Sequence, residues 1–108
     1  MYSDKDFNDI VSLVLRRVPG PRAIYLFGSY ARGAAGPESD IDIAILTDEP
    51  LDRKKKLNTL GVLWTDTVAK GYSIDFIIKP NQDFQDEKSL PTISRVISQE
   101  GKVLWQKT

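Results

Sequence analysis

Three aspartates lie where strands are expected to begin, and their spacing suits metal chemistry. Asp40 and Asp42 are two residues apart at the start of the apolar segment 41–46, so they fall on one face of a β-strand. Asp75 lies near the start of another apolar segment, residues 73–78. Carboxylates that lie close together repel one another unless a cation lies between them, and divalent cations such as Mg²⁺ prefer oxygen ligands. The three aspartates together therefore predict a metal site.

Each aspartate has an ordinary interpretation when it is taken alone. Asp40 fits a turn, Asp42 fits a solvated sheet face, and Asp75 fits an edge strand that is protected from pairing. The helix expected between the two segments favours a right-handed crossover between parallel strands, and parallel strands begin at the same edge of a sheet. We therefore prefer the joint interpretation, in which the crossover brings Asp75 close to the other two.

Composition excludes the other common kinds of catalytic site. The chain of 108 residues has no cysteine and no histidine, which excludes Cys/His zinc centres, cysteine nucleophiles and histidine bases. Lys plus Arg is 15 and Asp plus Glu is 15, and this zero net charge argues against a general nucleic-acid coat. No targeting signal precedes the first apolar segment, and no apolar run approaches the roughly 20 residues of a membrane helix. We expect a cytoplasmic protein that binds no membrane and makes no direct sequence-specific contact with nucleic acid.

A glycine-serine pair marks a second candidate binding element. Gly28 and Ser29 follow the apolar segment 22–27 and precede a short helix expected at 29–33. Glycine lets a phosphate approach the backbone, a helix start offers free N–H groups, and the serine adds a hydroxyl donor. If segments 22–27 and 41–46 are antiparallel neighbours, this turn and the aspartates meet at one edge of the sheet.

The remaining elements follow from hydrophobic spacing. Apolar residues from Phe7 to Val18 predict a first helix, which the sequence Pro19-Gly20-Pro21 ends. Further helices are expected at 51–70 and 91–100, a polar connection at 80–88, and a fourth, edge strand at 102–106. We thus expect residues 1–108 to form one α/β (α+β) domain, with a mixed sheet of about four strands and helices packed against it.

The combined motifs resemble the signature of the DNA polymerase β-like nucleotidyltransferase superfamily. Gly28-Ser29-Tyr30-Ala31-Arg32-Gly33 is followed by Ser39-Asp40-Ile41-Asp42, and Asp75 lies on a later strand. In a chain this short, the pattern is similar to the minimal nucleotidyltransferases found as MNT-domain antitoxins. The resemblance covers nearly the whole chain and therefore implies a single nucleotidyltransferase-fold domain.

The resemblance also implies roles for individual residues. Asp40, Asp42 and Asp75 would hold two Mg²⁺ ions, with Mn²⁺ as the alternative, and Asp75 would help to accept the proton of the attacking hydroxyl. Gly28 and Ser29 would bind the phosphates of ATP. Arg32 would contact the triphosphate or the departing pyrophosphate, although a surface arginine near Glu38 is an equal alternative.

The family further implies a partner protein. Its minimal members transfer AMP from ATP to a tyrosine of a HEPN-domain toxin, an RNase, and thereby act as its antitoxin. The larger enzymes bind their acceptor with a further domain; here we expect another protein, or an open surface of this chain, to hold it. The alternatives are an antitoxin that neutralises its partner by binding without turnover, and transfer to a small molecule such as an aminoglycoside.

Other conspicuous residues have simpler interpretations. The basic run Arg53–Lys56 is expected to be a solvated helix segment, with a contact to an acidic partner or RNA as the alternative. Leu57, Leu60, Gly61, Trp64 and Val68 form a stripe at helical spacing. Trp64 and Trp105 are expected to pack in the core or at the sheet edge, and Tyr30 to pack in the core rather than against a nucleotide.

Overall fold

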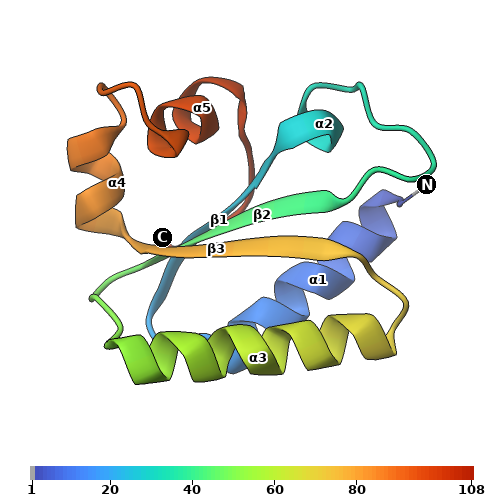
Figure 1. Cartoon of the computed structure of the whole chain (residues 1–108), viewed down its shortest axis with the longest axis horizontal. Coiled ribbons are helices and arrows are strands. Elements are labelled where there is room, and N and C mark those ends of the chain that lie inside the picture. The colour runs from blue at the N-terminus through green and yellow to red at the C-terminus, as the bar shows by residue number, and fades with distance from the viewer. Residues whose placement is uncertain (1) are drawn as a thin grey trace.

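A computed structural model of the chain describes residues 2–108. Within these residues five helices and four strands alternate except for one pair of successive helices, α4 and α5 (Figure 1). In chain order the elements are α1 (Asp4–Arg17), β1 (Pro21–Phe27), α2 (Gly28–Ala31), β2 (Ile41–Thr47), α3 (Arg53–Ala69), β3 (Ile74–Pro80), α4 (Asn81–Glu87), α5 (Ile93–Glu100) and β4 (Lys102–Gln106). All four predicted strands are confirmed, with boundaries shifted by at most two residues.

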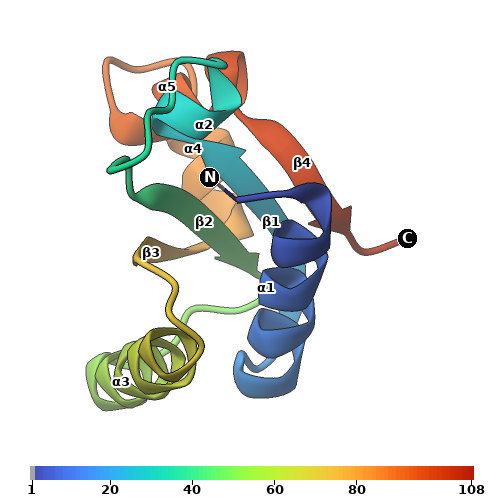
Figure 2. The same ribbon diagram turned by 90° about the vertical axis from the view of Figure 1, so that its right-hand side faces the viewer.

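The strands form one mixed sheet in the order β3-β2-β1-β4. β1 pairs antiparallel with β2 and with β4, whereas β2 pairs parallel with β3 through the crossover helix α3. The parallel relationship expected from the sequence is therefore confirmed, and the antiparallel pairing that would bring the glycine-serine turn to the aspartates is present. As a result, the end of β1 and the starts of β2 and β3 all meet at one edge of the sheet, and Figure 2 shows the whole molecule from that side.

Helices cover both faces of the sheet. α1 and α3 lie on one face, and α4 and α5 lie on the other (Figure 1). Ser3 and Asp6 form a capping box at the start of α1: the Asp6 carboxylate accepts from the Ser3 backbone N–H at 2.8 Å. None of the helices within residues 2–108 has the length and apolar character needed to cross a lipid bilayer.

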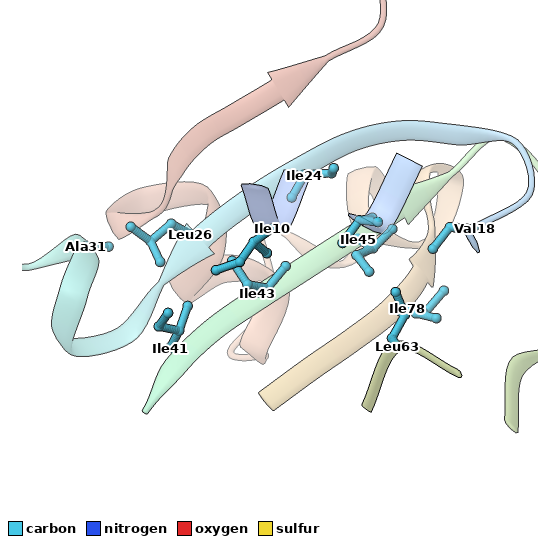
Figure 3. Packing of buried hydrophobic residues seen from close by; sticks show 11 residues of the cluster. Ile10, Val18, Ile24, Leu26, Ala31, Ile41, Ile43, Ile45, Leu63 and Ile78 are labelled. Carbon is cyan, nitrogen blue, oxygen red and sulfur yellow. The ribbon is translucent and has the colours of Figure 1, made fainter. Parts of the chain in front are cut away.

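The larger part of the core lies between the sheet and the helices α1 and α3. Alternate residues of β2 point into it, joined by residues of α1, β1 and α3 (Figure 3). Its best buried members are the aliphatic side chains Ile10, Val14, Ile24, Ile41, Ile43, Ile45 and Leu63. A smaller cluster, Ala23, Phe27, Ala44, Leu46, Phe84 and Ile97, fills the opposite face under α4 and α5.

Two expectations from the sequence are wrong. The segment expected as a polar connection at 80–88 contains the helix α4, whose Phe84 is buried in the smaller cluster and anchors it. On α3, the buried residues are Thr59, Leu63 and Thr67 rather than the predicted stripe, and Trp64 is 62% exposed. The threonines tolerate burial because their hydroxyls donate to carbonyls one turn earlier, at 2.8 Å in both cases.

Candidate active site

Asp42 and Asp75 alternate along their strands with residues of the larger core cluster, so they lie on the other face of the sheet, the one that α4 and α5 cover. Asp42 of β2 and Asp75 of β3 are direct partners in the parallel register. Asp40 precedes Asp42 by two residues and therefore falls on the same side. The sequence prediction that the crossover brings Asp75 beside Asp42 agrees with this register.

Ser73 holds the Asp40 carboxylate in place. Its hydroxyl donates to Asp40 Oδ1, and the backbone N–H of Ile41 donates to the Ser73 carbonyl at 3.0 Å. The Ser73 N–H in turn donates to the Tyr2 hydroxyl at 3.1 Å. Ser73 was not predicted from the sequence, although a serine two residues before Asp75 falls on the same face of the strand.

Gly28 lies directly against the Asp42 carboxylate. Phe27, at the end of β1, pairs with Asp42, and the chain then turns at Gly28 with φ of +74°. A Cβ atom at Gly28 would lie 2.1 Å from Asp42 Oδ2, which is far inside van der Waals contact. Only glycine therefore combines this backbone conformation with this close approach.

The charge of Asp42 is poorly compensated. Burial raises the pKa of the Asp42 carboxyl, the nearby carboxylates of Asp75 and Asp40 raise it further, and only Arg32 acts to lower it. A cation placed at this edge would relieve the repulsion between the three carboxylates. The electrostatics thus favour binding of positive charge beside Asp42.

The donor chemistry fits a hard divalent cation, since each carboxylate supplies oxygen ligands. Within residues 2–108, however, the carboxylates form no group of three or more close enough to hold an ion as they stand. Asp40 and Asp42 lie at the start of β2 and Asp75 lies at the start of the edge strand β3; Asp42 is half-buried and the other two are exposed. Asp42, pressed between Gly28 and Asp75, is the natural centre of such a site.

The short helix α2 continues from the Gly28 turn. Ser29 is its second residue, and Arg32, directly after it, is exposed with its guanidinium 4.0 Å from Glu100 of α5. The expected neighbour Glu38 is not the residue that pairs with Arg32. Tyr30 packs against Tyr2 and Phe7 with ring centroids 5.8 and 5.9 Å away, so its core interpretation is confirmed.

The chain is similar to known nucleotidyltransferases. The family model described as "Nucleotidyltransferase domain" matches residues 8–104. The chain is 33% identical over 100 residues to the protein adenylyltransferase MntA of Shewanella oneidensis, a match that covers 91% of this chain but only 63% of that protein. It is also 33% identical over 106 residues to the putative protein adenylyltransferase MJ0604 of Methanocaldococcus jannaschii, covering 97% of this chain and 100% of that one.

Solved structures show the same fold. A chain of a toxin–antitoxin complex with AMP-PNP superposes with a TM-score of 0.69 and 28% identity, covering 95% of this chain and 75% of that one. A chain of the complex of the tri-AMPylated Shewanella oneidensis HEPN toxin with its MNT antitoxin gives a TM-score of 0.62 at 26% identity, covering 97% and 74%. The fold is thus that of an α+β nucleotidyltransferase, as the sequence predicted.

Proposed function

Because this chain belongs to the nucleotidyltransferase domain family, we propose that it transfers AMP from ATP to a tyrosine hydroxyl of a partner protein. The similarity to two proteins named protein adenylyltransferases supports the reaction. The likeness to a chain crystallised with AMP-PNP supports ATP as the nucleotide. The single observation that carries the proposal is that Asp42 and Asp75 are partners in the register of β2 with β3, with Gly28 directly against the Asp42 carboxylate.

The reaction forms one bond and breaks another. The tyrosine oxygen attacks the α-phosphorus of ATP, the bond from that phosphorus to the bridging oxygen breaks, and pyrophosphate leaves. We assign Asp75 to orient the attacking hydroxyl and take up its proton, because it is exposed, lies beside Asp42 in the register and belongs to the edge strand β3.

Asp40 and Asp42 are proposed, with Asp75, to hold Mg²⁺. When bound, such ions stabilise the charge that develops on the entering and leaving oxygens. The uncompensated charge of Asp42 supports this assignment, and the bond from Ser73 orients Asp40 for it.

The Gly28 turn is proposed to bind the phosphates of ATP. Its lack of a side chain leaves space beside Asp42, and Ser29 adds a hydroxyl donor at the start of α2. Arg32 is exposed and only loosely paired with Glu100, so it can turn toward the leaving pyrophosphate.

We further propose that the partner is a HEPN-domain toxin, which makes this chain its antitoxin. Two of the similar structures are complexes of a toxin with an antitoxin, and one of those toxins carries AMP groups. We also propose a cytoplasmic location, because the proposed reaction consumes ATP.

Label transfer tests the proposal. The purified chain is incubated with ATP labelled at the α-phosphate, Mg²⁺ and lysate of its host, beside the variants Asp42→Asn and Asp66→Asn. Asp66 pairs with Arg17 between α1 and α3, on the other face of the sheet, and serves as the matched carboxylate control. We expect a labelled protein band with the wild type and Asp66→Asn but not with Asp42→Asn, and mass spectrometry should place AMP on tyrosine.

Other results would redirect the assignment. A band that survives Asp42→Asn contradicts the site. Binding of nucleotide without any labelled protein contradicts a protein acceptor and favours a small molecule. If the Asp42→Asn variant neutralises the partner as fully as the wild type does, neutralisation occurs by binding alone.

A further inference from the structure

The outward face of α3 is an apolar surface that nothing in residues 2–108 covers. Leu57, Trp64 and Val68 are 59%, 62% and 48% exposed. They lie with Gly61 at spacings of four, three and four residues, so all four follow one line along the helix. We call this line the α3 stripe.

The α3 stripe lies in an uncharged stretch of helix. No charged residue occurs between Leu57 and Thr65. The opposite face of α3, with Leu63 at its centre, is already packed on the sheet and α1. A helix that is apolar on both faces is typical of buried helices, yet α3 forms the outer margin of the molecule in both views (Figures 1 and 2).

Gly61 makes a notch in the α3 stripe. A Cβ atom there would meet nothing within 4 Å, so the glycine is not required by packing inside this chain. A shallow groove of about 490 Å³ runs over it, lined by Leu57, Asn58, Gly61, Val62, Thr65 and Asp66. Glycine weakens an exposed helix by about 1 kcal/mol relative to alanine, and here it provides space for a large side chain.

We propose that a second copy of this chain covers the α3 stripe, with the two α3 helices packed antiparallel. The stripe is complementary to itself in that orientation. Residues 61 and 64 share the same midpoint as residues 57 and 68, so one arrangement places Trp64 over Gly61 of the other copy and Leu57 against Val68. The contact of Trp64 with Gly61 and the contact of Leu57 with Val68 then each occur twice, as a two-fold axis requires.

The helix dipoles favour the same orientation. The first turn of α3 is basic throughout, Arg53–Lys56, which opposes the positive end of its own helix dipole. In the antiparallel pair this turn lies beside the C-terminal end of the other α3. That end carries the negative pole of the dipole, and its Lys70 is already paired with Asp9 of α1 at 3.0 Å. The exposed run Arg53–Lys56 therefore meets the dipole of the other helix rather than an acidic surface.

The pairing leaves the candidate active site open. Asp42 and Asp75 alternate along their strands with residues of the larger core cluster, so they lie on the face of the sheet opposite α3, and the two sites of the dimer face away from each other. The proposal is therefore independent of the proposed reaction, and either can fail without the other.

Sedimentation velocity over about a hundredfold range of protein concentration tests the proposal. One helix pair is a small interface, so we expect a monomer that becomes a dimer as the concentration rises. Trp64→Lys should stay monomeric at every concentration. Leu90→Lys, a matched change at a residue that is 52% exposed outside the α3 stripe, should dimerise like the wild type. A wild-type chain that stays monomeric throughout overturns the proposal.

Engineered cysteines test the orientation, since the native chain has none. In the antiparallel pair, position 57 faces position 68, whereas each position lies about 16 Å from its own copy along the helix axis. Mixing the Leu57→Cys and Val68→Cys proteins should therefore give a heterodisulfide, and neither protein alone should cross-link. Efficient cross-linking of each variant with itself indicates parallel helices and overturns the antiparallel arrangement.

Discussion

The strand β2 presents two different surfaces to the two faces of the sheet. On the side of α1 and α3, Ile41, Ile43 and Ile45 are fully buried among aliphatic side chains (Figure 3). On the side of α4 and α5, the same strand carries Asp42, then Ala44 and Leu46. A single alternating segment thus supplies both the core and the centre of the candidate site.

This contrast indicates a division of work between the faces. The aliphatic face supplies stability, because burial of its side chains is the main favourable contribution to folding. The other face carries carboxylates at its open edge, and their mutual repulsion lowers the stability of the fold. Substitutions at neighbouring residues of β2 should therefore affect different properties.

The largest expected effect on folding comes from the aliphatic face. Ile43→Ala should lower the free energy of unfolding by about 3 kcal/mol, because it leaves a cavity among fully buried side chains. Asp42→Asn, one residue away, should leave this free energy unchanged or raise it, since the ionised carboxylate is disfavoured there. Urea denaturation measures both; equal destabilisation by the two substitutions would remove the contrast.

The next effect concerns the close approach at Gly28. Gly28→Ala should lower the free energy of unfolding by about 2 kcal/mol and displace the Asp42 carboxylate. The new Cβ would collide with that carboxylate, and alanine would also be strained at the positive φ of this position. Gly33→Ala is the control, because Gly33 also has a positive φ of 70° but open space around its Cβ position. If both variants lose the same stability and activity, the contact with Asp42 has no separate role.

A smaller effect is expected at Ser73, which we regard as a positioning residue. Ser73→Ala removes the hydroxyl that holds Asp40, so we expect AMP transfer to fall about tenfold with little change in unfolding free energy. Ser73→Thr keeps the hydroxyl and should restore most of the rate. A variant that loses stability in proportion to rate would indicate a structural role instead.

The smallest effect concerns Tyr72, beside α1. Burial, followed by hydrogen bonds to the carboxylates of Asp9 and Asp6, raises the pKa of the Tyr72 hydroxyl to about 12. A raised pKa means that the stabilisation is complete below the unfolded-state value of about 10 and is lost as the pH rises through about 12. Relative to Tyr72→Phe, the wild type should therefore lose about 1 kcal/mol between pH 9 and pH 11. Urea denaturation at each pH measures the free energy of unfolding of both proteins. A difference between the two that does not change from about pH 9 to about pH 11 would contradict the assignment.

The sequence predicted the strands and their relationships well because these depend on strong local signals. The alternation of Ile41–Leu46 and the long crossover after it were enough to place Asp75 beside Asp42. The helix α4 was missed because its single buried residue, Phe84, gives no helical period among polar neighbours. The outward direction of the α3 stripe was missed because α3 is apolar on two sides, and hydrophobic spacing alone favours the wrong one.

Local sequence also could not identify the neighbours of exposed side chains. Arg32 lies near Glu100 of α5 rather than near Glu38, since the antiparallel pairing of β1 with β4 brings α5 beside α2. Ser73 gave no signal of its own, because its contact with Asp40 depends on the register of β2 with β3. Pairings across the sheet determine these contacts.

The central claim is that one face of β2 performs the chemistry and the other maintains the fold. The most direct measurement is the rate of AMP transfer per folded molecule, for Asp42→Asn and for Ile43→Val, with the folded fraction measured by circular dichroism in the same samples. We predict that Asp42→Asn is fully folded and inactive, whereas Ile43→Val is less stable but transfers AMP at the wild-type rate per folded molecule. Transfer by Asp42→Asn, or a loss of rate per folded molecule in Ile43→Val, would contradict the claim.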